Sequence, residues 1–445
     1  MTIVENIGWV LVLIGIMIMI HELGHYWAAR YFDVRVEAFS FGFGPKLYGF
    51  QWGETEFKIC AILFGGYVKM AGEQIGESIK PSGAEEAANP RSFLAKPRWQ
   101  RMIIAFAGPF MNIMLAVALL TGLYMVKYPK LPESANGTVG LVMANSAAAK
   151  AGIREGDRVV AFDGARNPQW EDILMKEIQS AGVPMNVTVE RAGQEVSFTV
   201  TPEMDQKAGV GSLGWAEQAE IQIGGVEEGM DAERKGLQRG DILLFANGQP
   251  IRSSYRLREI VRASQGKPVE VIYSRNGQQI TSSIQPSERE TDGQKVFMIG
   301  VRLEPRVQYV ALSFGDALVE SASQNFKGAT MIFSFIERMI QGRMSPKSLE
   351  GPIRIAQLSG DAAREGADAF FALMAMVSLN LAVFNLLPIP ILDGGVMLML
   401  FIEMIWRRDL SMQVKETVMK FGFVFLMCVV VFVLYNDISK VLPKS

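Results

Sequence analysis

Four long apolar stretches dominate the pattern of hydrophobic and polar positions along this chain. The first begins at Ile7, and the other three cover Met102 to Val126, Ala369 to Leu392 and Phe421 to Asn436. A helix needs about 20 apolar residues to cross the hydrocarbon core of a bilayer, a length that the second and third stretches reach. The fourth is shorter, and the long side chain of Lys420 can anchor it at the interface. The pattern therefore predicts four transmembrane helices.

The first stretch carries polar residues at membrane depth. Ile7 to Ile20 forms only about 21 Å of helix, so the span must continue to Ala29 through "HELGH" at 21–25. A cleaved signal peptide fits poorly, because "MTIVEN" has no basic residue and no small-residue cleavage site follows. Charged side chains at membrane depth are costly and usually functional.

Lysines and arginines indicate the orientation of the spans. Two basic loops stand out, one with Arg91, Lys96, Arg98 and Arg101, the other with Arg407, Arg408, Lys415 and Lys420. The positive-inside rule predicts that both loops are cytoplasmic. The termini and residues 127–368 then lie on the opposite side, although Lys127 and Lys130 oppose this orientation.

The segment between the second and third spans contains a duplication. "AGIREGDRVVAFDG" (151–164) matches "KGLQRGDILLFANG" (235–248) at an offset of 84, and "GVPMNVTVERAGQ" matches "GKPVEVIYSRNGQ" in the same register. Each copy predicts a strand, a helix and a hairpin with Asp-Gly or Asn-Gly turns. The copies resemble bacterial PDZ domains, at 127–218 and 219–306. Such domains hold a peptide as an added strand, and a spacer or steric plug without a ligand is an equal alternative.

Residues 307–366 predict amphipathic helices, because "SFGDALVESASQNF" and "GATMIFSFIERMI" place apolar residues at three- and four-residue steps. We expect these helices to lie along the membrane surface. Packing as a soluble helical hairpin is the alternative.

Composition narrows the class of protein. Hydrophobic residues make up 49% and charged residues 20%, so the chain combines membrane and water-facing parts. The net charge of −2 argues against nucleic acid as a partner. Cys60 and Cys428 are far apart and predict no disulfide framework.

The two histidines of the chain, His21 and His25, both lie in "HELGH". Residues four apart share one helix face, so both imidazoles can bind one zinc ion, with Glu22 as general base. A buried structural cluster is the alternative. A catalytic zinc site needs three protein ligands, and the candidates for the third are a carboxylate or one of the two cysteines.

Asp393, in "FNLLPIPILDGG" at 384–395, is a carboxylate that can reach this depth. Pro388 and Pro390 must break the third helix, and Gly394 and Gly395 allow a tight turn. Irregular backbone at membrane depth is tolerated where it is buried or lines a wet cavity. An ordinary helix end with Asp393 at the interface is the alternative.

These motifs together resemble the site-2 protease family of intramembrane zinc metalloproteases. The resemblance covers nearly the whole chain and includes "GFG" at 42–44, "GGYVKM" at 65–70, "AGPFMN" at 107–112 and "SLNLAVFNLLPIPILDGG" at 378–395. It implies one zinc ion per chain, held by His21, His25 and Asp393, with Glu22 activating a water for peptide hydrolysis.

The resemblance also implies residues that bind substrate. Asn380 and Asn385 would lie beside the active site and hold an extended substrate backbone, or else join membrane helices through polar contacts. Val36 to Met70 would form a β-sheet at the membrane, with Gly42, Phe43 and Gly44 binding substrate as an added strand. A soluble cytoplasmic hairpin is the alternative.

The expected protein is a polytopic α-helical membrane protein with four transmembrane helices, a membrane-associated β-sheet and two periplasmic PDZ domains (α+β). Residues 1–126 and 367–445 form the protease core in the bacterial inner membrane, with the active site toward the cytoplasm. By resemblance, its substrates are single-span membrane proteins already trimmed in the periplasm, such as an anti-sigma factor, with remnant signal peptides as a second class. The PDZ pair would exclude untrimmed substrates.

Two other functions fit parts of the sequence. A PDZ scaffold or chaperone with a structural metal does not need Glu22 as a base. A metal-ion transporter needs a polar path across several spans, and the second and fourth spans offer almost no polar residues.

Overall fold

The computed structural model describes residues 2–72, 89–130, 137–205, 210–291, 294–341 and 351–441. The chain divides into two compact units. The first comprises 1–128, 311–337 and 346–445, and the second comprises 129–310 and 338–345. Strands β3 (Tyr128–Lys130) and β20 (Gln308–Val310), where the chain enters and leaves the second unit, pair with each other.

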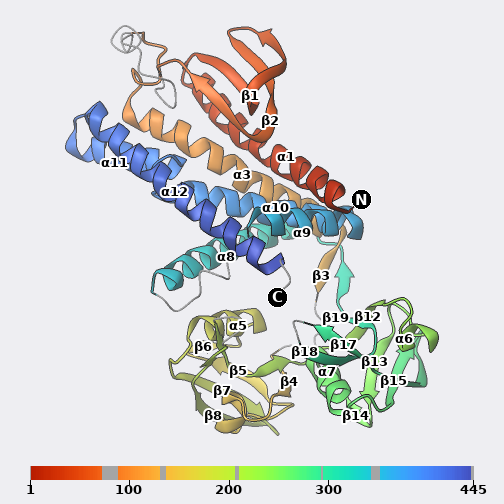
Figure 1. The fold of residues 1–445 in the computed structure, drawn as a ribbon. Helices are drawn as coiled ribbons and strands as arrows, with labels where there is room; N and C mark the ends of the chain where they lie inside the picture. The colour runs from red at the N-terminus through yellow and green to blue at the C-terminus, as the bar shows by residue number, and fades with distance from the viewer. Residues whose placement is uncertain are drawn as a thin grey trace. The chain divides into compact units, whose positions relative to one another are not determined.

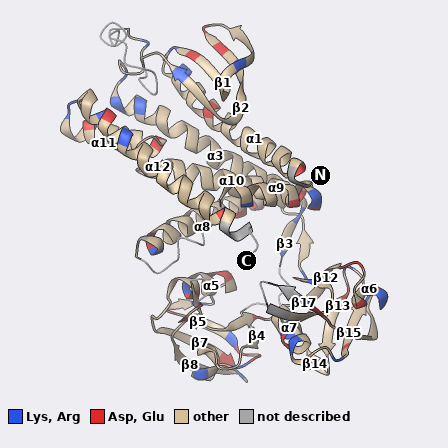
Figure 2. Ribbon diagram, viewed as in Figure 1, with Lys and Arg blue, Asp and Glu red and all other residues tan. Residues whose placement is uncertain are grey.

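The first unit is mainly helical. Among the described residues, four of its helices are long and apolar enough to cross a membrane: α1 (Thr2–Tyr31), α3 (Arg98–Val126), α10 (Ala367–Leu386) and α12 (Met412–Val441). The prediction of four such helices is confirmed. Figure 1 shows α1, α3 and α10 running alongside one another, and Figure 2 shows long uncharged stretches in them. Buried Leu13 and Met17 of α1 pack with Phe370 and Met374 of α10, which joins the first span to the third.

Three further helices of this unit lie in the described part of the chain. They are α8 (Phe314–Ile340), α9 (Pro352–Glu365) and α11 (Asp393–Trp406). The two amphipathic segments predicted after residue 307 are one continuous helix, α8. The apolar helix α11 was not predicted, because the third predicted span ends at Leu392 and the next apolar stretch begins at Phe421.

The β-sheet expected over Val36 to Met70 is present in the first unit as two long strands, β1 (Val36–Trp52) and β2 (Thr55–Met70). Both bend at glycines with positive φ, namely Gly42 (+90°), Gly44 (+85°) and Gly65 (+137°). Because of these bends, Phe39 pairs with both Phe57 and Val68. The hairpin therefore folds back on itself and packs against α1 through a shared apolar core.

The second unit consists of two β-rich domains with the same order of elements. The first has β5 (Arg158–Phe162), α5 (Trp170–Gln179), β7 (Met185–Arg191) and β8 (Gln194–Val200), and these recur 84 residues later as β13 (Ile242–Ala246), α7 (Ser254–Ala263), β15 (Val269–Arg275) and β16 (Gln278–Ile284). Each domain encloses its own apolar core. The predicted strand, helix and hairpin of each copy are confirmed.

Smaller elements complete the second unit. They are β4 (Val139–Val142), α4 (Ala147–Ala151), β6 (Ala165–Arg166), β9 (Glu203–Met204), β10 (Gly211–Ser212), β11 (Trp215–Glu217), β12 (Ile221–Val226), α6 (Asp231–Arg234), β14 (Gln249–Pro250), β17 (Ser287–Thr291), β18 (Gln294–Met298) and β19 (Val301–Pro305).

The duplication extends to individual interactions. Asp157 accepts two hydrogen bonds of 2.7 Å from the Arg191 guanidinium, and Asp241 accepts two of 2.7 Å from Arg275. Both aspartates are buried. Each pair ties the start of one strand to the end of another, so the same ion pair holds both domains together.

Candidate metal centre

His21, His25 and Asp393 lie together in the interior of the helical unit. His21 Nε2 is 3.2 Å from Asp393 Oδ2, and His25 Nε2 is 3.4 Å from Asp393 Oδ1. The two Nε2 atoms are 3.2 Å apart, and each histidine is 8% exposed. Three potential ligand atoms, one from each residue, therefore lie within 4.8 Å of one another.

The break in the chain after α10 positions Asp393 beside the two histidines. The helix ends at Leu386, and Leu387 is extended, as expected from the prolines that follow. Ile391 has a φ of +90°, which is uncommon for a β-branched residue. Asp393 is the first residue of α11, so the turn precedes it.

The expectation of a tight turn at Gly394 and Gly395 is wrong. Both glycines are helical, in the first turn of α11. A Cβ on Gly394 would lie 2.3 Å from the Leu387 carbonyl oxygen, and one on Gly395 would lie 2.3 Å from that of Ile389. The absence of side chains allows α11 to pack against the preceding backbone, which holds Asp393 near the histidines.

The cysteines do not join this group. Cys60 is buried in β2 with its sulfur 3.3 Å from Ser40 Oγ, and Cys428 is exposed on α12. Within the described part of the chain, the metal-ligand geometry is met by His21, His25 and Asp393. The tertiary structure thus favours the carboxylate among the candidates for a third ligand.

Two groups on α3 orient the imidazoles. His25 Nδ1 donates to the Ile104 carbonyl oxygen at 2.8 Å. This tautomer leaves the lone pair of Nε2 free for a metal, as in most metal-ligating histidines. His21 Nδ1 lies 3.3 Å from the side-chain amide of Asn112, which is fully buried.

The side-chain oxygen of Asn112, Oδ1, is a buried acceptor that lacks a donor within the described residues. The two ends of an amide are assigned from their contacts, and a half-turn of this one lets Oδ1 accept a hydrogen bond from His21 Nδ1. His21 then also presents a free Nε2 to the metal. Asn112 ends the motif "AGPFMN" but was not among the predicted site residues, although an asparagine inside an apolar span is itself a signal.

Replacing Asn112 with alanine is expected to lower zinc affinity about 10- to 100-fold, the usual effect of removing a group that orients a ligand. Competition with a chromogenic chelator measures this on the purified chain. Thr121→Val, on the same helix, is the matched control, because Thr121 bonds to Ser321 and not to a histidine. Unchanged affinity in Asn112→Ala would show that His21 is held without the amide.

Glu22 lies between the histidines in sequence, and β2 passes beside it. Its side chain is half-buried on the same helix as the two histidines. A Cβ on Gly66 would be 3.2 Å from Glu22 Cγ. The sheet therefore approaches the acid closely at a position without a side chain.

The other predicted site residues lie on α10 and in β1. Asn380 and Asn385 are half-buried on α10, and neither side chain has a hydrogen bond within the described residues. Gly42, Phe43 and Gly44 lie in β1 just beyond Phe41, which pairs with Gly66. Phe43 is 44% exposed and stacks on Tyr67. Their role in substrate binding stays a prediction.

The donor set fits zinc. Two imidazole nitrogens and one carboxylate are a usual ligand set for catalytic zinc, which keeps its fourth position open. The tautomer fixed at His25 and the orphaned acceptor of Asn112 both suit two metal-bound Nε2 atoms.

Comparison with known proteins agrees with this chemistry. The chain is 30% identical over 454 residues to "Regulator of sigma-E protease RseP" of Escherichia coli strain K12, covering 97% of each chain. It is 31% identical over 447 residues to "Putative zinc metalloprotease NMA0084" of Neisseria meningitidis serogroup A, covering 96% of this chain and 97% of the relative.

One solved structure, the PDZ domain of the SdrC-like protein Lmo2051 from Listeria monocytogenes, is similar at 19% identity with a TM-score of 0.18. It covers 19% of this chain and 87% of that chain. The profile of peptidase family M50 matches residues 9–429. The resemblance seen in the sequence is confirmed, and the chain belongs to peptidase family M50, the site-2 protease family.

Proposed function

We propose that this chain is an intramembrane zinc metalloendopeptidase that cleaves the membrane-spanning segments of single-span proteins. The observation that carries the proposal is the group formed by His21, His25 and Asp393, with Glu22 beside it. Two of these ligands lie on α1, which is long and apolar enough to span a membrane.

Each residue has a defined task. His21 and His25, through Nε2, and the Asp393 carboxylate hold one zinc ion. When bound, zinc supplies Lewis acidity at the scissile carbonyl and lowers the pKa of water toward about 7. The Glu22 carboxylate takes a proton from the attacking water and delivers it to the leaving amide nitrogen. The close approach of β2 to Glu22 supports this role, because it limits the space around the base.

The sheet formed by β1 and β2 has a role in binding substrate. Amide bonds inside a substrate helix are hydrogen-bonded and cannot be attacked until the helix is extended. Addition of the extended segment to a strand edge replaces the lost hydrogen bonds. The position of β2 beside Glu22 supports binding along this sheet, with Gly42, Phe43 and Gly44 in the adjoining strand. Asn380 and Asn385 would hold the substrate backbone from α10.

We place the enzyme in the bacterial inner membrane, with the active site toward the cytoplasm and two PDZ domains, 127–218 and 219–306, in the periplasm. The protease core is 1–126 with 367–445, and 307–366 lies along the membrane surface. The name of the Escherichia coli relative supports an anti-sigma factor as substrate, cleaved after periplasmic trimming in envelope stress signalling. Remnant signal peptides are a second substrate class.

Removal of zinc tests the metal assignment. Dialysis of the detergent-solubilised chain against a strong chelator is expected to abolish cleavage of a trimmed single-span substrate, and one equivalent of zinc should restore it. Metal analysis checks that the active protein holds one zinc per chain. Full cleavage by protein shown to contain no metal would refute the assignment.

Deletion of 131–304 tests the size filter. Because β3 and β20 pair where the chain enters and leaves the second unit, the ends left by the deletion are already neighbours. We expect the shortened protein to cleave untrimmed substrate that the full chain rejects, measured on a gel beside the trimmed form. Unchanged selectivity would contradict the filter.

A further inference from the structure

The fourth long apolar helix, α12, touches the rest of the first unit at only a few places. Over residues 421–430, Gly422 alone is buried, and its neighbours are exposed or half-buried. Asn436 and Asp437, near the other end of the helix, are buried as well. A helix that mostly faces outward is positioned by the few contacts it makes, so these contacts show what α12 does.

Gly422 lies against the backbone of Pro390. A Cβ on Gly422 would be 2.5 Å from the Pro390 carbonyl oxygen and 2.5 Å from the Pro390 Cβ. Real side chains do not come this close, so α12 reaches Pro390 only because position 422 has no side chain. Pro390 belongs to the turn 387–392, three residues before Asp393. The helix therefore packs directly on the backbone that leads to the third metal ligand.

The turn 387–392 is enclosed from two directions. Gly394 and Gly395, at the start of α11, pack closely against carbonyl groups of the turn, and Gly422 of α12 packs against Pro390. Within the turn, Ile391 has a φ of +90°, an unfavourable conformation for a β-branched residue. Such a conformation persists only where the surrounding structure imposes it. The two helices supply these surroundings.

Polar groups hold α12 on either side of Gly422. Lys415 Nζ is 2.7 Å from the Oε1 atom of Glu403, which is fully buried on α11. Lys415 lies two turns before Gly422, on the same face of α12. Beyond Gly422, the Asp437 carboxylate accepts hydrogen bonds of 2.9 and 3.1 Å from two backbone N–H groups at the start of α9. These contacts fix α12 to α11 and α9, with Gly422 against the turn between them.

We infer that Gly422 is a positioning residue for the metal centre, because it lets α12 hold the turn that presents Asp393 to zinc. Gly422 acts through Pro390 and not through contact with the metal. The inference rests on the proposed zinc site and extends it to the fourth long helix, which supplies no ligand.

Zinc affinity tests the inference, measured on the full-length chain in detergent by competition with a chromogenic chelator. Gly422→Ala is expected to bind zinc about 10- to 100-fold more weakly than the wild type, the usual effect of disturbing a group that orients a ligand. Gly8→Ala on α1 is the matched control, because its Cβ would meet nothing within 4 Å. Wild-type affinity in Gly422→Ala would overturn the inference.

Cobalt in place of zinc provides a spectroscopic signature of the ligand set. Its d–d absorption depends on the number and arrangement of the ligands. At saturating cobalt, Gly422→Ala is expected to give the spectrum of Asp393→Ala, because both changes remove the carboxylate from its place. The wild-type spectrum in Gly422→Ala would show that Asp393 stays in position without the close contact, and would contradict the inference.

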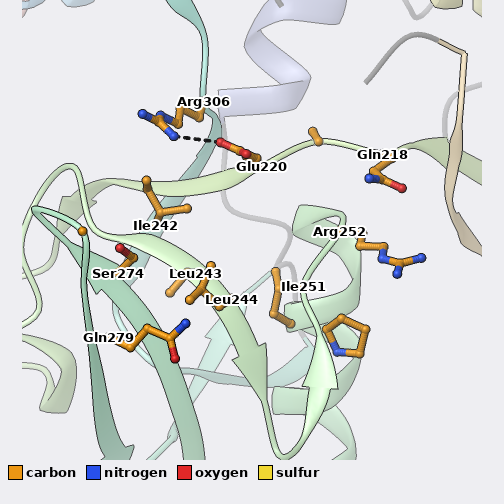
Figure 3. A pocket seen from close by; sticks show the side chains of 13 residues that line it. Gln218, Glu220, Ile242, Leu243, Leu244, Ile251, Arg252, Ser274, Gln279 and Arg306 are labelled. Carbon is orange, nitrogen blue, oxygen red and sulfur yellow. Dashed lines mark hydrogen bonds and ion pairs between the residues drawn. The ribbon is translucent and has the colours of Figure 1, made fainter. Parts of the chain in front are cut away.

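A destabilising change in the second unit controls for a general loss of stability. Ile251 lines a cavity of about 510 Å³ in the second β-rich domain, as do Leu244 and Arg252 (Figure 3). It is 5% exposed, and truncation of a buried isoleucine to alanine is destabilising. Ile251→Ala should lower the midpoint of thermal unfolding and leave zinc affinity unchanged. Weaker zinc binding in this variant would show that affinity follows overall stability, against a specific role of Gly422.

Hydrogen exchange on the wild type covers the case in which Gly422→Ala does not fold. Because coupling between two sites is reciprocal, zinc should slow exchange at 388–396 and also at 418–426 of α12, and leave 429–433 unchanged. No effect at 418–426 would contradict the inference. A wild-type chain that takes up no zinc would refute the proposed function and this inference with it. Equal zinc binding by the wild type and Gly422→Ala would refute the inference alone, so the two failures are distinguishable.

Discussion

Glu22→Gln is expected to bind one zinc per chain and to cleave at least about 100-fold more slowly than the wild type. Glutamine keeps the shape of the side chain but cannot accept the proton of the attacking water, a transfer that contributes about 10²- to 10⁴-fold to rate. The ligands His21, His25 and Asp393 are unchanged. Metal analysis and cleavage of a trimmed single-span substrate, measured on the same preparation, separate binding from chemistry.

Glu5→Gln is the matched control, because Glu5 lies on the same helix and is exposed, close to Arg364. It should cleave at the wild-type rate. Cleavage by Glu22→Gln at that rate would show that another group is the base. Loss of zinc from Glu22→Gln would instead assign the carboxylate to metal binding.

Gly108→Ala is expected to abolish both zinc binding and cleavage by adding one methyl group. A Cβ at this position would lie 2.3 Å from His25 Nε2 and 2.8 Å from His21 Cε1, well inside van der Waals contact. Both imidazoles would have to move, and His25 is held through Nδ1 by the Ile104 carbonyl oxygen of the same helix. Zinc content after dialysis and the cleavage rate measure the effect.

Gly122→Ala provides the control for the same substitution on α3. Its Cβ would meet nothing within 4 Å, and alanine favours a helix over glycine by about 1 kcal/mol. It should keep zinc and activity. Wild-type zinc content in Gly108→Ala would mean that α3 can shift away from α1, and that Gly108 does not set the size of the site.

The sequence by itself determined the local elements of this protein. Runs of apolar residues predict the four long helices, since crossing a bilayer depends on length and composition alone. The offset of 84 predicts two copies of one domain, because similar sequences in the same register fold into similar local structure. The spacing of His21 and His25 places both on one helix face. The apolar runs and the histidine spacing each lie within a short window of the chain, and the duplication is found by comparing two such windows.

The tertiary structure decided what distant segments contribute. Taken from the residues alone, Asp393 and the two cysteines were all candidates for the third ligand, and the break after α10 places the carboxylate beside the histidines. Ile104 and Asn112, which orient the imidazoles, lie 79 and 91 residues away from them. Gly394 and Gly395 read as a turn, yet they serve close packing of α11. The hydrophobic periodicity of one segment does not predict such contacts, because they depend on how helices pack against one another and not on the order of residues within one helix.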